Sequence, residues 1–392
     1  WVKTSSQAGY IFQQPLYKDN IVYVSEESFA LKKWIVYAFR KDTGKEIWRA
    51  NGEGVLFSMP PALSDDLIVI PGRKLTALNR LTGEKVWEVN SSGKDYNFRG
   101  PIIYNSHIYA IDSVINSGTN SNIFSFDLAS GEIIWKKYIS AYSYLGLSIA
   151  DNIVIAMTGT YRNYTSVQAF AISNGDPIWT YSHLYNPSGP LVVDRDRNIG
   201  LFQNTRRTMA VVDLGTGARL GGLEYGDIAA TSPVLLDHKA YYFASNSSST
   251  YLCSFDYLAI DSMTTKKISS TFRIEHSSNP VMVGNRLFLS TPENELWSMS
   301  LTGDQISKYP IAVSGSRIIS MMYADGLFLV VNRESDKIYA IADGPVPVIA
   351  ESSLSLDSPY KNEDGYQPYL GQLHSHYIPD VPTWSKLWNG LP

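Results

Sequence analysis

The amino-acid sequence predicts an all-β protein: an eight-bladed β-propeller of four-stranded blades, closed by the N-terminal strand and followed by an irregular C-terminal tail. Three observations support this prediction. A motif that ends in tryptophan recurs at roughly 40 to 50 residues, a period typical of repeat folds. A short strand that ends in a polar turn precedes each copy, which gives eight units. The 26 tyrosines and the scarcity of long helical apolar periods favour strands over helices.

The motif is best preserved in the first four units, where a glycine precedes the tryptophan by four residues. Later copies decay. Gly217 and Gly303 remain without a tryptophan, and the eighth copy ends at Gly344, before its fourth strand. The four complete copies are residues 37–48, 76–87, 125–135 and 169–179.

Each unit is interpreted as four strands, with the glycine in the turn between the third and the fourth. A turn that leads into a bulged hairpin needs one residue at positive φ, which glycine adopts without steric cost. A tryptophan buries on the order of 200 Å², so the indole is expected to pack against the next blade. The predicted blade-docking residues are Trp1, Trp48, Trp87, Trp135, Trp179, Gly44, Gly83, Gly131, Gly175, Gly217 and Gly303.

The N-terminus is expected to complete the eighth unit, which otherwise ends in an exposed edge prone to pairing with other chains. Trp1 lies 47 residues before Trp48, which equals one repeat, and residues 1–3 match the segment that begins at Trp87. Residues 1–9 are therefore predicted to close the last blade. The domain prediction is a propeller over residues 1–345 and a Pro/aromatic-rich extension over residues 346–392.

The spacing Ala-x-x-x-x-Thr-Gly-x-x-x-Trp in several copies resembles the repeat of the PQQ-like β-propeller superfamily, in which PQQ is pyrroloquinoline quinone. That superfamily contains quinoprotein alcohol and glucose dehydrogenases. It also contains non-catalytic propellers such as the lipoprotein subunit of the bacterial β-barrel assembly machinery. Fold alone does not choose between these functions.

For the dehydrogenases, the resemblance implies a quinone held against a vicinal disulfide, with a calcium or lanthanide ion ligated by Glu, Asn and Asp. Cys253 is the only cysteine, so that disulfide cannot form, and it is interpreted as a buried small apolar residue. The residues that enter the predicted innermost strands include no carboxylate. No cofactor, metal site or catalytic residue is therefore predicted. Arg99 and Arg317 are candidates to contact an anionic ligand in the central funnel, with structural salt bridges as the alternative.

The composition limits the partners. The chain has 33 basic and 37 acidic residues and no basic stretch, so nucleic acid is not an expected partner. It has no apolar run long enough to span a bilayer, and it begins at Trp1, as a processed chain does. Asn90, Asn163 and Asn246 lie in sequons for N-linked glycans, which favours a secreted, extracellular glycoprotein. A periplasmic location is the alternative.

The tail is dense in proline and aromatic residues, a composition that excludes regular elements and differs from that of solvated linkers. It is expected either to dock on its own propeller or to anchor in another subunit, which permits self-assembly. The candidate partner contacts are Tyr366, Tyr369, Tyr377, Trp384 and Trp388.

The sequence thus predicts a non-catalytic extracytoplasmic binding or assembly scaffold, with a protein or identical subunits as its partner. The alternative is an enzyme that uses the central funnel, either a divergent quinoprotein dehydrogenase or a hydrolase.

Overall fold

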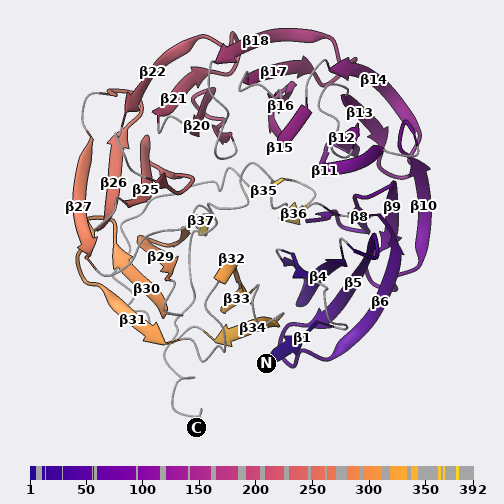
Figure 1. The fold of residues 1–392 in the computed structure, drawn as a ribbon, viewed down its shortest axis with the longest axis horizontal. Coiled ribbons are helices and arrows are strands. Elements are labelled where there is room, and N and C mark those ends of the chain that lie inside the picture. Colours follow the sequence, from indigo (N-terminus) through magenta and orange to yellow (C-terminus); the bar gives the residue numbers. More distant parts are fainter. Residues whose placement is uncertain are drawn as a thin grey trace. The chain divides into compact units, whose positions relative to one another are not determined.

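The computed structural model describes residues 1–5, 11–13, 15–28, 30–54, 56, 60–93, 96–114, 121–139, 142–159, 165–183, 191–203, 208–224, 229–245, 249–260, 263–270, 280–291, 295–310, 318–332 and 337–342, together with 361–362, 365–366 and 377–378. Every regular element in these residues is a β-strand. The strands form an eight-bladed propeller of four-stranded antiparallel blades, which confirms the predicted fold class (Figure 1).

The chain divides into two compact units. The larger unit consists of Gln7–Asp227 and Tyr360–Leu373 and holds blades 1 to 5. Blade 1 contains β2 (Ile11–Phe12), β3 (Leu16–Lys18), β4 (Ile21–Ser28), β5 (Lys33–Arg40) and β6 (Glu46–Glu53). Blade 2 contains β7 (Ala62–Leu63), β8 (Leu67–Ile70), β9 (Lys74–Asn79) and β10 (Lys85–Asn90). Blade 3 contains β11 (Tyr96–Tyr104), β12 (His107–Val114), β13 (Ser121–Asp127) and β14 (Ile133–Ile139). Blade 4 contains β15 (Tyr142–Ala150), β16 (Ile153–Gly159), β17 (Thr165–Ala171) and β18 (Pro177–His183). Blade 5 contains β19 (Val192–Asp194), β20 (Ile199–Gln203), β21 (Thr208–Asp213) and β22 (Arg219–Glu224).

The smaller unit consists of Trp1–Ser6, Ile228–Pro359 and His374–Pro392 and holds blades 6 to 8. Blade 6 contains β23 (Ala229–Ala230), β24 (Val234–Leu236), β25 (Lys239–Ser245), β26 (Thr250–Asp256) and β27 (Thr264–Ser269). Blade 7 contains β28 (Val281–Val283), β29 (Arg286–Ser290), β30 (Glu295–Ser300) and β31 (Ser307–Pro310). Blade 8 contains β32 (Ile318–Ala324), β33 (Leu327–Asn332), β34 (Lys337–Ala342) and β1 (Val2–Thr4).

Closure of blade 8 by the N-terminal strand is confirmed. β1 pairs antiparallel with β34, with Val2 opposite Tyr339 and Thr4 opposite Lys337. The pairing continues to the first residue, because the Ala340 amide donates to the carbonyl of Trp1 at 2.9 Å. The N-terminal ammonium of Trp1 donates to the Ala340 carbonyl at 3.3 Å. The last blade thus gains its fourth strand from the other end of the chain.

The described tail residues form three strands of two residues each, which corrects the expectation that the proline content excludes regular elements there. In the larger unit, β35 (Lys361–Asn362) pairs antiparallel with β36 (Gly365–Tyr366). In the smaller unit, β37 (Tyr377–Ile378) pairs parallel with β28 of blade 7. Blade 7 therefore has a fifth strand that comes from the tail of the same chain.

The hydrophobic core lies between neighbouring blades. Tyr109 and Trp135 of blade 3, for example, pack in one cluster with Ile149, Val154 and Phe170 of blade 4. The second strand of a blade is buried on both faces, as all four residues of β8 are. The outermost strand alternates between less and more exposed positions, as in β6. Within each unit, neighbouring blades therefore stabilise one another.

Candidate functional site

Four turn glycines, Gly83, Gly131, Gly175 and Gly217, lie directly under the indoles of Trp48, Trp87, Trp135 and Trp179 in the preceding blade. Gly44, Gly83, Gly131, Gly175, Gly217 and Gly303 all have φ between 64° and 76°, in the left-handed region. A Cβ built on Gly217 would lie 2.5 Å from the Trp179 ring, and one on Gly83 would lie 2.7 Å from the Trp48 ring. Glycine at these positions thus satisfies two requirements, the backbone conformation and the close approach of the ring.

The same four indoles are fixed by hydrogen bonds to the next blade. The Trp48 Nε1 donates to the carbonyl of Arg80 at 2.9 Å, and the Trp179 Nε1 donates to the carbonyl of Leu214 at 2.7 Å. Trp87 and Trp135 make equivalent bonds to Leu128 and Ile172 at 3.0 and 2.8 Å. Each contact joins the fourth strand of one blade to the turn of the next, so the motif couples successive blades of the larger unit.

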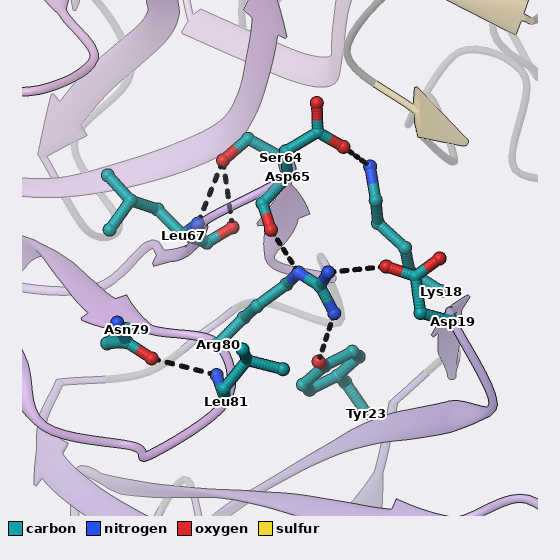
Figure 2. Close-up of polar contacts among 9 residues, drawn as sticks. All are labelled: Lys18, Asp19, Tyr23, Ser64, Asp65, Leu67, Asn79, Arg80 and Leu81. Atoms are coloured by element: carbon teal, nitrogen blue, oxygen red, sulfur yellow. Dashed lines mark hydrogen bonds and ion pairs between the residues drawn. The ribbon is translucent and has the colours of Figure 1, made fainter.

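A polar cluster accompanies the first of these contacts (Figure 2). Arg80 is 7% exposed and follows β9 at a position that Leu128, Ile172 and Leu214 occupy in the next three blades. Its guanidinium pairs with Asp19 in the turn of blade 1, donates to the Asp65 carbonyl and lies 3.4 Å from the Tyr23 hydroxyl. The cluster also contains Lys18, which pairs with Asp65. It therefore links the polar turns of blades 1 and 2.

Burial changes the titration of this cluster. Burial raises the pKa of the Tyr23 hydroxyl, although the nearby Arg80 acts against that rise. Burial, the largest effect on Arg80, acts to lower its pKa, but its contacts with Tyr23 and Asp19 outweigh burial and raise it. The guanidinium therefore stays charged. The arrangement is suited to joining two blades rather than to proton transfer.

Three fully buried carboxylates lie in second strands, and each is bound by donors of its own blade or of the adjoining loop. Glu26 accepts a hydrogen bond from the Tyr37 hydroxyl at 2.6 Å. Glu27 accepts from the Gln13 side chain at 2.8 Å and from the Leu56 amide at 2.6 Å. The third, Asp112, accepts from the Ser92 amide at 2.7 Å and from the Asn122 side chain at 2.8 Å. Glu27 and Asp112 thus fix loops that connect blades, Glu26 joins two strands within blade 1, and sequence reasoning did not identify any of the three.

The predicted ligand, glycan and partner residues are only partly described. Arg99 lies buried on β11, opposite Ile111, and Arg317 lies outside the described residues. Asn90 is exposed at the end of β10, whereas Asn163 and Asn246 lie outside the described residues. Of the tail candidates, Tyr366 is in β36 and Tyr377 is in β37. The remaining candidates, Tyr369, Trp384 and Trp388, lie outside the part of the chain that the structure describes.

Comparison with known proteins identifies the family. The family model described as "Outer membrane protein assembly factor BamB" matches residues 32–257. The chain belongs to the BamB family. The protein of that name from Shewanella oneidensis is 23% identical over 257 residues, which cover 59% of this chain and 58% of the relative. The one from Bordetella pertussis is 26% identical over 218 residues, or 50% of this chain and 52% of the relative. The chain thus spans about half the length of these curated relatives.

Solved structures show the same fold at low sequence identity. BamB from Moraxella catarrhalis superposes with a TM-score of 0.61 at 16% identity and covers 87% of this chain and 98% of its own. A quinohemoprotein alcohol dehydrogenase from Comamonas testosteroni gives 0.67 at 14% identity and covers 92% and 78%. The predicted resemblance to the PQQ-like propellers is therefore confirmed for the fold.

The residues of this BamB-family chain do not fit the quinone site that the resemblance implies. The single cysteine cannot form a vicinal disulfide. Cys253 is buried on β26, and burial raises the pKa of its thiol to about 12. Among the described residues, no group of three or more His, Cys, Asp and Glu side chains is placed to hold a metal ion. No described helix is long and apolar enough to cross a membrane.

The most regular exposed feature is an aliphatic residue at the β-bulge of each outer strand in blades 1 to 5. The bulge interrupts pairing just before the tryptophan position, as between Lys85 and Trp87. The residue there is 44% to 51% exposed in every case. The five residues are Ile47, Val86, Ile134, Ile178 and Leu220. In four of the five blades the sequence signal for this position is an aliphatic residue directly before the tryptophan.

Proposed function

We propose that this protein is a non-catalytic scaffold that assists the assembly of outer membrane proteins and acts in the periplasm. The family match over residues 32–257 carries the proposal, because the matched relatives are named as outer membrane protein assembly factors. These relatives also favour the periplasmic alternative over an extracellular glycoprotein. The bound state of Glu26, Glu27 and Asp112 supports a structural role for the buried acids.

The proposed partner is another protein rather than a small substrate. The blades of the larger unit, coupled through indole contacts, offer outer strands and loops as surfaces for protein recognition.

The tail is proposed to dock on its own propeller rather than on another subunit, because β37 pairs with β28 of the same chain. Truncation after Gly344 should then leave the particle size in light scattering at that of a monomer, as in the full chain. A drop from oligomer to monomer would instead support assembly through the tail.

A complementation experiment tests the function. The chain, directed to the periplasm, would be expressed in a bacterium that lacks its own family member, and the folded fraction of outer membrane barrels would be measured by heat-modifiable gel mobility. We expect recovery toward the level of the parent strain. No recovery, with the chain present and folded in the periplasm, would contradict the proposal.

A second experiment addresses the enzyme alternative, which the dehydrogenase-like fold raises. The purified chain would be incubated with PQQ and calcium, desalted, and its absorbance recorded. A scaffold retains no quinone. Stoichiometric retention would favour a quinoprotein.

A further inference from the structure

Blade 3 departs from the other blades of the larger unit on its outer strand. At the position before the bulge, the other four blades carry Glu46, Lys85, Pro177 and Arg219, whereas blade 3 carries Ile133. At three residues after the tryptophan position, the other blades carry Asn51, Asn90, Ser182 and Glu224, whereas blade 3 carries Tyr138. The first position in the other blades thus has charges or proline, the residues that protect exposed sheet edges from pairing with other chains, and the second has polar residues. β14 has apolar or aromatic residues at both positions.

The substituted residues are exposed and lie along one strand. Ile133 is 51% exposed, the bulge residue Ile134 is 45% exposed, and Tyr138 is 61% exposed. β14 has seven residues, a length of about 23 Å, and within the described residues its one neighbouring strand is β13. Its other edge follows the outside of blade 3 (Figure 1). The strand thus combines an open backbone edge with three exposed large side chains.

The two lysines of β14 are turned toward the propeller. The Lys136 ammonium donates to the Ser92 hydroxyl at 2.8 Å and lies 5.0 Å from the centre of the Phe124 ring. The Lys137 ammonium pairs with Asp176 of blade 4 at 2.8 Å. Lysines commonly protect an edge by extending across it, whereas these two are held along the faces of the blade, where Lys136 still places its charge beside the cross-strand position of an added strand. The edge therefore stays accessible.

We propose that β14 is a docking edge that accepts an extended segment of another protein as a fifth strand of blade 3. Strand addition uses the backbone groups of the edge for affinity and alternate side chains for selectivity. Ile133, Ile134 and Tyr138 would contact apolar side chains of the added segment. This inference rests on the proposed scaffold function, because it names the surface through which the scaffold holds its protein partner.

The occupant is a different chain rather than a second copy. Antiparallel pairing of the whole of β14 with its own copy places Lys136 directly opposite Lys136, and like charges opposite each other destabilise a strand pair. A segment with a neutral or acidic centre and apolar flanks avoids this repulsion. Charge complementarity therefore selects a partner strand with that pattern.

A peptide-binding experiment tests the edge. The probe is a fluorescein-labelled eleven-residue peptide of alternating valine and threonine with a central glutamate, and fluorescence anisotropy measures its Kd. The double variant I133K/Y138N places on β14 the residues that blade 2 has at Lys85 and Asn90, and it is expected to weaken binding at least tenfold. A matched control, Ile178→Lys, removes an equally exposed aliphatic residue from β18 and should change the Kd less than twofold.

Hydrogen exchange of the wild-type chain locates the bound peptide without any variant. We expect slower exchange in the fragment that covers residues 133–139 and unchanged exchange in residues 85–90. A peptide with prolines at alternate positions, which cannot donate to the ladder, should not bind. Three results would each overturn the proposal: equal Kd values for the wild type and I133K/Y138N, protection on another strand, or no binding of the peptide at about 1 mM. At that concentration a Kd of about 1 mM would still be detected. A wild-type dimer that I133K/Y138N makes monomeric would also overturn it, since the occupant would then be a second copy.

The proposed docking edge and the proposed scaffold function can be refuted separately. A chain that complements the bacterial strain but shows no peptide protection at residues 133–139 would lose the docking edge and keep the proposed function. A chain that binds the peptide at β14 but does not complement would lose the function and keep the edge.

Discussion

Substitution of Gly217 by alanine should test the two reasons for glycine in the turn, which are the positive φ and the close approach of the indole. Gly217 has φ of 70°, and a Cβ there would meet the Trp179 ring at 2.5 Å. The left-handed backbone costs a residue with a side chain about 1–2 kcal/mol. Relief of the overlap with a buried indole costs a further ~1–3 kcal/mol, because the ring is also held by its bond to the Leu214 carbonyl. We expect the free energy of unfolding to fall by about 2–5 kcal/mol.

Gly284 provides the matched control. Its φ is 57°, and a Cβ built there has no neighbouring atom within 4 Å, so Gly284→Ala incurs only the backbone cost of about 1–2 kcal/mol. In a Trp179→Ala background, Gly217→Ala should cost no more than Gly284→Ala does. Urea unfolding followed by tryptophan fluorescence and circular dichroism measures all four variants. Equal losses for Gly217→Ala and Gly284→Ala, or no coupling between positions 179 and 217, would refute the docking argument.

Three further predictions concern burial, polar contacts and closure. Burial raises the pKa of both Cys253 and Tyr109 to about 12, from 9.0 and 10.0, so the folded chain keeps protons that the unfolded chain loses. Stability should therefore fall as pH rises toward 12, at about 1.4 kcal/mol per pH unit for each group, from pH 9 for Cys253 and from pH 10 for Tyr109. Cys253→Ala should reduce the slope between pH 9 and 10, and an unchanged slope would contradict the cause. Arg80→Leu, which introduces the residue that blades 3 and 5 have at this position, should change the free energy of unfolding by less than about 1 kcal/mol. Arg80→Ala should lower it by at least ~2 kcal/mol in urea unfolding. Equal losses for the two variants would show that the ion pairs themselves stabilise the fold. Removal of residues 1–9 should lower the melting temperature by many degrees because it exposes the edge of β34, and an unchanged melting curve would contradict closure through that strand.

The sequence was sufficient to predict the architecture because its signals are local and repeated. A glycine at positive φ followed four residues later by tryptophan defines a turn and a bulged fourth strand, and each copy reports the same geometry. The closing strand could also be predicted, since Trp1 lies one repeat before Trp48 and the eighth unit lacks a fourth strand. Periodicity therefore determined both the number of blades and the way the last one is completed.

The contacts that depend on three-dimensional neighbours could not be predicted in the same way. Arg80 stands where other blades have leucine or isoleucine, and only the fold shows that Asp19, 61 residues earlier, lies within reach of its guanidinium. In the sequence, Glu27 and Asp112 are acids in apolar strands with no visible partner. The structure shows that the backbone amides of two loops bind them. The exposure of Ile133 and Tyr138 likewise depends on which edge of blade 3 faces solvent.

A decayed repeat of the smaller unit keeps the turn glycine although no tryptophan packs on it. Gly303 keeps φ of 75°, but the nearest atoms that a Cβ would meet are those of the Lys266 stem, at 2.9 and 3.3 Å, followed by Leu252 at 3.4 Å. The Lys266 ammonium pairs with Asp304, one residue beyond the glycine, at 2.8 Å. Blade 3 makes the same kind of contact, since Lys137 lies near Gly175 and pairs with Asp176. A lysine stem can thus cover the turn where the indole is absent, because its methylene groups pack while its charge reaches the aspartate. The glycine is therefore required by the turn and by whatever side chain covers it, and the loss of tryptophan in a repeat does not signify loss of contact between blades.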